Sequence, residues 1–279
     1  MASAVEHWLD VPGARIRYEI RGAGPLLVVF GVPLPGSAFA PLAELLASRR
    51  TVVTFDPRGF AGSTVDDPHE DLLPDTVAED VHRLLRKVAS GPAQVFGTSG
   101  GAVSGLALVA RHSEQVATLV AHEPPIVEAL PEVQRAREHA ATEDVYQTFR
   151  TQGAAAAWPK FMAINGFAPS GPLEPPPDPS PPSAQDQADG DRMLAHWMRA
   201  CTHFRPDLRA LRAAPTRIVA GLGDATTADQ LVRRATEALV AELDLPVVSF
   251  PGGHTGFMSD PQGFADALEK ALDVRSSPA

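Results

Sequence analysis

Cysteine and long hydrophobic runs are scarce in this sequence of 279 residues. The single cysteine, Cys201, excludes an intrachain disulfide and fits a reducing compartment, so a cytoplasmic protein is expected. The longest apolar runs, such as 26–30 and 106–110, fall far short of the ~18 residues that a membrane-spanning helix needs. The first ten residues lack the basic and apolar regions of a secretion signal, so none is expected.

Basic side chains are also in the minority. Lys and Arg number 24 against 34 Asp and Glu, which gives a formal net charge of −10. Nucleic acids and anionic membrane surfaces are bound by clustered Lys and Arg, so neither is expected as a partner. The remaining composition, with 44% apolar and 21% charged residues, is that of an ordinary globular protein.

Short apolar runs alternate with longer helical patterns along the chain. The runs predict strands at 15–20, 26–30, 52–55, 93–96, 116–122, 217–220 and 247–250. Helices are predicted between them, one of them starting at a Thr76–Glu79 capping box. Strand and helix alternation with short connections favours an α/β fold, in which a mostly parallel central sheet is flanked by helices.

The alternation is interrupted between residues 126 and 205. Within this range, residues 132–152 and 191–204 have helical spacing, and residues 169–182 contain eight prolines. Proline fixes φ and removes a backbone donor, so that stretch is predicted to be a loop or polyproline segment. We expect one α/β domain formed by residues 1–125 and 206–279, with residues 126–205 inserted as a helical unit.

The strongest functional signal is Gly97-Thr98-Ser99-Gly100-Gly101, between a predicted strand and a predicted helix. Glycines two residues before and after the serine allow a very tight turn that exposes the hydroxyl, and the helix N-terminus favours developing negative charge. The glycine spacing fits neither a phosphate-binding loop nor a dinucleotide fingerprint. The pattern resembles the G-x-S-x-G nucleophile elbow of α/β-hydrolases.

Two further segments resemble this family. Residues 56–63 are similar to a stretch that commonly precedes the elbow, and we interpret them as a structural turn. Residues 31–37 occupy the place of the family's oxyanion loop, although Phe30 stands where a histidine usually precedes the glycine. The resemblance implies that the backbone N–H groups of Val32 and Gly100 stabilise an oxyanion.

His254, in a glycine-rich segment after the last predicted strand, is the candidate general base. It follows Ser99 by 155 residues, in agreement with the family order of serine, acid and histidine.

Two carboxylates are candidates for the acid of the triad. Asp224 follows a strand at the place where the family usually keeps the acid. Glu123 follows the strand after the elbow helix, the place used by lactonases that resemble the zearalenone hydrolases. Either can orient the imidazole, and both remain open.

Substrate-binding and metal-binding candidates are weaker. The candidates for lining a substrate pocket are His196, Trp197, His203 and Phe257, although Trp and Met side chains at helical spacing equally fit a core. The histidines other than His254 form neither H-E-x-x-H nor Cys/His ligand spacing. No metal ligands are therefore expected.

The resemblance implies a serine hydrolase that cleaves a carboxylic ester or lactone through an acyl-enzyme, without a cofactor. Its partner would be a small, largely apolar substrate held under a lid formed by the insertion, in a monomer or small homo-oligomer. A serine nucleophile separates it from epoxide hydrolases and haloalkane dehalogenases, which use aspartate. C–C hydrolysis, perhydrolysis, or acyl transfer or cyclisation are alternatives on the same triad. A ligand-binding protein on this scaffold, with little turnover, is an alternative of a different class.

Overall fold

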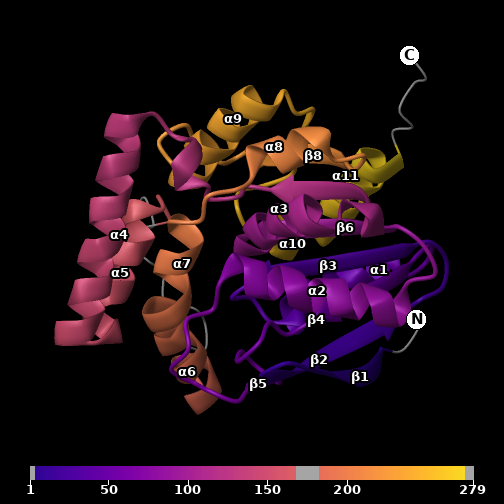
Figure 1. The fold of residues 1–279 in the computed structure, drawn as a ribbon, viewed down its shortest axis with the longest axis horizontal. Coiled ribbons are helices and arrows are strands. Elements are labelled where there is room, and N and C mark those ends of the chain that lie inside the picture. The colour runs from indigo at the N-terminus through magenta and orange to yellow at the C-terminus, as the bar shows by residue number, and fades with distance from the viewer. Residues whose placement is uncertain (1–3, 168–181, 274–279) are drawn as a thin grey trace.

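The computed structural model describes residues 4–167 and 182–273 (Figure 1). Its central sheet has nine strands, in the order β1-β2-β4-β3-β6-β7-β8-β9, with β5 paired to β2. The strands are β1 (Val5–Val11), β2 (Ala14–Arg21), β3 (Leu26–Val32), β4 (Thr51–Phe55), β5 (Thr64–Val65), β6 (Ala93–Ser99), β7 (Val116–His122), β8 (Arg217–Gly223) and β9 (Val247–Phe250). Along the sheet order β4-β3-β6-β7-β8-β9, every pairing is parallel, which confirms the predicted α/β class.

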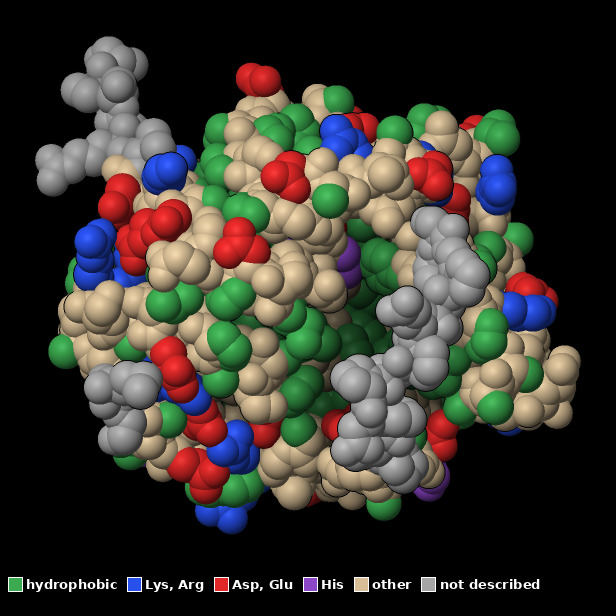
Figure 2. Space-filling model, turned by 180° about the vertical axis from the view of Figure 1, so that it is seen from behind, with side chains coloured by type: hydrophobic (Ala, Val, Ile, Leu, Met, Phe, Trp, Pro, Cys, Tyr) green, Lys and Arg blue, Asp and Glu red, His purple; other side chains and the backbone are tan. Residues whose placement is uncertain are grey.

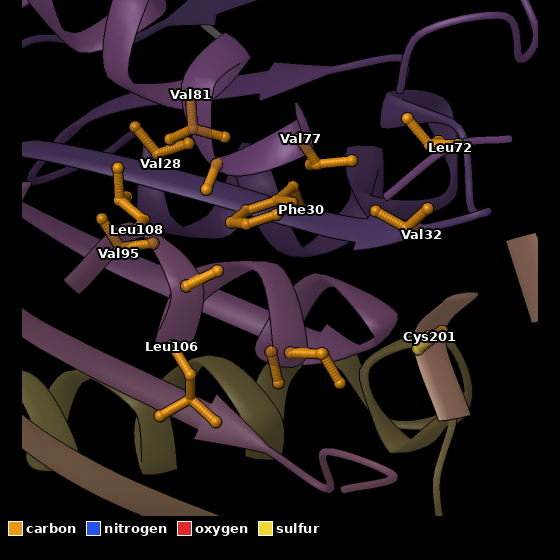
Figure 3. Close-up of a cluster of buried hydrophobic side chains, with 14 of the residues drawn as sticks. Val28, Phe30, Val32, Leu72, Val77, Val81, Val95, Leu106, Leu108 and Cys201 are labelled. Atoms are coloured by element: carbon orange, nitrogen blue, oxygen red, sulfur yellow. The ribbon is translucent and has the colours of Figure 1, made fainter. Parts of the chain in front are cut away.

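Helices cover both faces of the sheet. They are α1 (Ala40–Leu46), α2 (Pro74–Val88), α3 (Gly100–His112), α9 (Leu231–Leu243), α10 (Gly256–Ser259) and α11 (Pro261–Asp273), with short 3₁₀ turns η1 (Gly36–Phe39) and η2 (Ser113–Gln115). Strand β3 supplies both faces, because successive side chains of a strand point to opposite sides. Val28 and Phe30 pack with α2 and α3, as Figure 3 shows, whereas Leu27 and Val29 pack with α1 and α11.

The chain between β7 and β8 is helical. It contains η3 (Val127–Ala129), α4 (Glu132–Gln152), α5 (Ala154–Ile164), α6 (Ala184–Arg192), the π-helical turn η4 (Met193–Trp197), α7 (Met198–Thr202) and α8 (Leu208–Ala213). Helices α4 to α7 stand together at one end of the sheet (Figure 1). The proline-rich residues 169–182 lie outside the described residues, except for Pro182. The division into 1–125, 126–205 and 206–279 stays a prediction.

The start of α2 differs from the prediction. The helix begins at Pro74, and no side chain caps it. Proline is favoured in the first turn because its missing N–H needs no partner there. The predicted Thr76–Glu79 capping box is therefore wrong. Glu79 instead faces the end of α3, where its Oε1 lies 2.8 Å from His112 Nε2.

Residues 56–63, after β4, form a buried polar brace. The Asp56 carboxylate accepts the N–H groups of Gly36 at 2.8 Å and Gly62 at 3.1 Å. Arg58 forms a two-point ion pair with Asp80 of α2, at 2.9 and 2.7 Å. Burial raises the pKa of Asp80, although Arg58 opposes that effect. These contacts fix the loop against α2, in keeping with a structural role.

Within the two described stretches, every helix is too short or too polar to cross a membrane.

Candidate active site

Ser99 lies at a strained turn between β6 and α3. Its backbone has φ 54° and ψ −126°, a left-handed conformation that costs free energy in a residue other than glycine. The turn is tight enough that a Cβ on Gly97 would lie 2.5 Å from the carbonyl oxygen of Gly101. A Cβ on Gly101 would lie 2.7 Å from the carbonyl oxygen of Phe30. The two glycines of the motif are therefore required by the backbone.

Val32 and Gly100 flank the serine. Val32, the last residue of β3, pairs with Ser99 in the strand register, and Gly100 is the first residue of α3. All three residues line one cavity. Gly100 must be a glycine here, because a Cβ would lie 2.5 Å from the Trp197 ring and 2.6 Å from the carbonyl oxygen of Val32. The structure thus brings both predicted oxyanion residues to the serine.

The buried Glu123 and the half-buried His254 form a pair at the end of β7. Glu123 Oε2 lies 2.7 Å from His254 Nδ1, and Oε1 accepts the N–H of Gly223 at 2.9 Å. Glu123 has no exposed surface and has a left-handed φ of 49°. Burial alone would raise its pKa, but the hydrogen bond from His254 lowers that pKa to about 2. The group is therefore ionised at neutral pH.

His122, next to Glu123 in the chain, is a buried neutral imidazole. Its Nδ1 lies 2.9 Å from Thr98 Oγ1, and its ring lies 6.3 Å from that of His254. Burial lowers its pKa to about 4. Sequence analysis missed this residue, because only its place beside Glu123 hints at a role. Its neutral ring adds no charge that competes with His254 for the carboxylate.

Asp224, the other acid candidate, contacts the loop of His254 and not its ring. Its Oδ1 accepts the N–H of Gly252 at 2.8 Å, and its own N–H donates to the carbonyl of Phe250 at 2.9 Å. These bonds hold β8 to the glycine-rich segment that carries the histidine. Of the two carboxylates that the sequence left open, the structure brings only Glu123 to the imidazole.

The cavity beside Ser99 has a volume of about 60 Å³ and mostly apolar walls. Figure 2 shows one face of the molecule hollowed, with hydrophobic side chains in the hollow. The walls come from the elbow region, the chain between β7 and β8, and α9: Val32, Pro33, Ser99, Gly100, Pro125, Phe161, Asn165, Phe167, Met193, Trp197, Met198, Cys201, Thr202 and Val232. Burial raises the pKa of the Cys201 thiol, so this side chain stays protonated and does not compete with the serine as a nucleophile.

Trp197 is the one predicted pocket residue that lines this cavity. The other three candidates make contacts elsewhere. His196 Nδ1 lies 2.9 Å from Asp71 Oδ1, the His203 ring packs 4.3 Å from the His139 ring, and Phe257 is buried against Phe39. Phe167 was missed by sequence analysis. Its ring lines the cavity and stacks on that of His254 at 4.8 Å, which joins the pocket wall to the Glu123–His254 pair.

These features define a hydrolase fold with a serine elbow, and comparison with known proteins agrees. The chain belongs to the alpha/beta hydrolase family, which matches residues 26–267. It is 31% identical over 278 residues to a Bacillus subtilis (strain 168) protein, the uncharacterized hydrolase YraK, with 95% of each chain covered.

Two solved structures share the fold at low sequence identity. An esterase from Thermogutta terrifontis has a TM-score of 0.70 at 18% identity and covers 97% of this chain and 98% of its own. The enol-lactonase from Burkholderia xenovorans LB400 has a TM-score of 0.67 at 17% identity and covers 95% of this chain and 99% of its own. The expected family and fold are confirmed.

Proposed function

We propose that this protein is a serine hydrolase that cleaves a carboxylic ester or lactone through an acyl-enzyme. One observation carries the proposal: an elbow serine and a histidine–carboxylate pair stand at the ends of the adjacent strands β6 and β7. Ser99 is the nucleophile, His254 the general base and Glu123 the acid. This arrangement follows the serine–histidine–carboxylate logic found on unrelated folds.

In the proposed acylation step, the Ser99 hydroxyl attacks the substrate carbonyl while Nε2 of His254 takes its proton. In the described part of the structure, His254 bonds to Glu123 through Nδ1 but makes no hydrogen bond to Ser99. A rotation of the Ser99 or His254 side chain must therefore precede this proton transfer. The N–H groups of Val32 and Gly100 then donate to the tetrahedral oxyanion. A donor of this kind is worth about 3 kcal/mol of transition-state stabilisation. His254 returns the proton to the leaving oxygen, and the acyl-enzyme forms.

In the proposed deacylation step, a water takes the place of the released leaving group, gives a proton to His254 and attacks the acyl carbonyl. The bond between the acyl carbon and Ser99 Oγ then breaks, Ser99 Oγ takes the proton back from His254, and the carboxylic acid leaves. Glu123 accepts the Nδ1–H throughout, which selects the tautomer with a free Nε2 and stabilises the imidazolium that forms in each half-reaction. The low pKa of Glu123 supports this role, because the carboxylate keeps its charge while the histidine cycles.

The cavity supports a small, apolar acyl group as the substrate. A volume of about 60 Å³ leaves room for only a few heavy atoms beside the serine in this conformation. Esterase and enol-lactonase are the activities named for two proteins of the same fold, and both are acyl transfers to water. A short-chain ester or a small lactone therefore fits best.

A fluorophosphonate probe tests the proposal directly, since it modifies only activated serines. We expect the intact mass of the wild type to increase by one adduct, and that of Ser99→Ala to stay unchanged. No adduct on a folded wild type would contradict the assignment and favour a ligand-binding role. An adduct that persists in Ser99→Ala would place the nucleophile elsewhere.

Turnover then distinguishes the reaction. On a panel of p-nitrophenyl acetate and small lactones, Ser99→Ala is expected to lower kcat by about 10⁵–10⁶, because the triad acts as a unit. Retention of most of the activity by that variant would disprove the covalent mechanism.

A further inference from the structure

A second cluster of reactive side chains lies between α2 and α3. Glu79 and His82 stand three residues apart on α2, so they share one face of that helix. His112 is the last residue of α3. One ligand atom from each of the three lies within 4.8 Å of the others, and all three residues are half-buried.

The two imidazoles are held in a defined orientation. Their rings stack at 3.8 Å with an interplanar angle of 17°. His82 Nδ1 lies 2.8 Å from Gln115 Oε1, which leaves Nε2 as the free nitrogen of that ring. His112 Nε2 lies 2.8 Å from Glu79 Oε1, and its Nδ1 faces Glu114 at 4.0 Å. Metal-binding histidines commonly have one nitrogen tethered by an amide or carboxylate oxygen, as Nδ1 of His82 is by Gln115.

The charges around the cluster come from both helices. Arg111 lies 3.3 Å from Glu79 Oε1, and Arg83 lies 3.7 Å from Oε2. Both arginine side chains are more than one-third exposed, so they can turn to solvent when a cation takes their place. The negative end of the α3 dipole lies at His112 and favours a positive charge there.

We propose that Glu79, His82 and His112 form a binding site for a divalent metal ion such as Zn²⁺. Two imidazoles and one carboxylate form a ligand set that suits Zn²⁺, Ni²⁺ or Cu²⁺, and the half-exposed position leaves room for a water as a further ligand. The metal replaces the proton shared by His112 and Glu79. Sequence spacing did not predict this site, because its histidines lie on different helices.

The site is structural and independent of the proposed hydrolase chemistry. Helix α3 runs from Gly100 to His112, which puts the cluster roughly 20 Å from the serine at 1.5 Å per residue. A bound ion crosslinks α2 to α3 and therefore stabilises the folded chain, since the unfolded chain lacks the site.

Calorimetric titration of chelator-treated full-length protein with Zn²⁺ tests the proposal. We expect one ion per chain, with the dissociation constant raised at least about tenfold in His82→Ala and in His112→Ala. His69→Ala, which removes an exposed histidine outside the cluster, is the matched control and should bind as the wild type does. No binding to the wild type, or equal binding by all four proteins, would overturn the proposal.

Two further measurements separate lost ligation from lost folding. Circular dichroism establishes that each variant is folded without metal. Added Zn²⁺ should then raise the Tm of the wild type and of His69→Ala, but not that of His112→Ala. A Tm that rises equally in His112→Ala would place the metal elsewhere. Because the site is independent of the proposed hydrolase chemistry, the fluorophosphonate adduct on Ser99 should form with or without Zn²⁺.

Discussion

Glu123 occupies a position that few carboxylates do, with a left-handed backbone, no exposed surface and two hydrogen bonds. Its side chain reaches from the end of β7 to the loop that carries His254, where Oε2 lies 2.7 Å from Nδ1. Non-glycine residues hold such a conformation when their surroundings determine it fully, and the bond from Gly223 N–H does so here. At the scale of one residue, backbone geometry therefore places the proposed acid.

Exchange of each acid candidate for its amide separates their roles. Glu123→Gln should lower kcat by about 10⁴, because the amide no longer selects the required tautomer. Asp224→Asn keeps an oxygen that can accept the Gly252 N–H, so its loss should stay below about tenfold. Steady-state kinetics on one ester measures both. Equal losses in the two variants would contradict the assignment of Glu123.

Single candidate residues can be found from sequence where chemistry demands a local motif. Ser99 as a proposed nucleophile needs glycines at fixed spacing, and His254 as a proposed base needs a loop after the last strand. The proposed acid could not be chosen from sequence, because a carboxylate at the end of β7 or of β8 fits the same chain order. His122 and Phe167 lacked any local motif, and tertiary packing alone brings them to His254.

At the scale of elements, the π-helical turn η4 determines the shape of the pocket. It carries Met193 and Trp197 to the serine, and the Trp197 ring packs directly on Gly100. Local π turns add a residue to the helix and often occur at functional sites. In the proposed function, the indole is therefore the wall that would limit the length of an acyl group.

Removal of that wall should change substrate preference. Trp197→Ala should raise the ratio of kcat/KM for p-nitrophenyl octanoate over acetate by at least about tenfold, since each accommodated methylene contributes up to a few kcal/mol. Trp8→Ala is the control: it removes an exposed indole from β1 that does not line the cavity. If both variants keep the wild-type ratio, Trp197 does not limit the length of the acyl group.

The ion pair between Arg58, in the segment after β4, and Asp80 of α2 contributes to the stability of the fold. Asp80→Asn leaves the buried Arg58 without its charge partner and should lower the free energy of unfolding by about 3 kcal/mol. Asp75→Asn, on the exposed part of α2, should change it by less than about 0.5 kcal/mol. Urea unfolding measures both. Similar values for the two variants would show that burial of the pair does not matter.

Elements were predictable where they are buried on both faces, because continuous apolar runs mark strands such as β3 and β4. Strand β1 was missed, since its side chains are mostly exposed and polar residues interrupt its apolar ones. Helix α1 was missed too, as seven residues are too few for a clear helical period. Strand order and the antiparallel β1–β2–β4 edge arise from pairing across the sheet, which a single chain pattern does not encode.

At the scale of the whole molecule, two buried groups make the fold sensitive to acid. The pKa of His122 is about 4 in the folded chain, against an ordinary value of 6.5, so the unfolded chain takes up this proton first. Stability therefore falls as the pH drops from 6.5 toward 4. Glu123, with its pKa lowered to about 2, contributes stability above its ordinary value of 4.5 that is lost below it.

Urea unfolding at pH 7 and pH 5 tests the first of these effects. The free energy of unfolding of the wild type should fall by about 2 kcal/mol more than that of His122→Asn, at 1.36 kcal/mol per pH unit of proton linkage. The asparagine can still bond to Thr98 but does not titrate. Parallel losses in the two proteins would mean that His122 takes up its proton equally in both states.

The chain's one cysteine is enclosed in the pocket wall, where its thiol stays protonated. Maleimide reagents attack thiolates that solvent can reach, so Cys201 of the wild type should not react with a maleimide dye. A reporter placed by Gln134→Cys, on the exposed surface of α4, would be the sole labelled position. Fluorescence from a single site on the helices between β7 and β8 can thus be measured without prior removal of a native thiol.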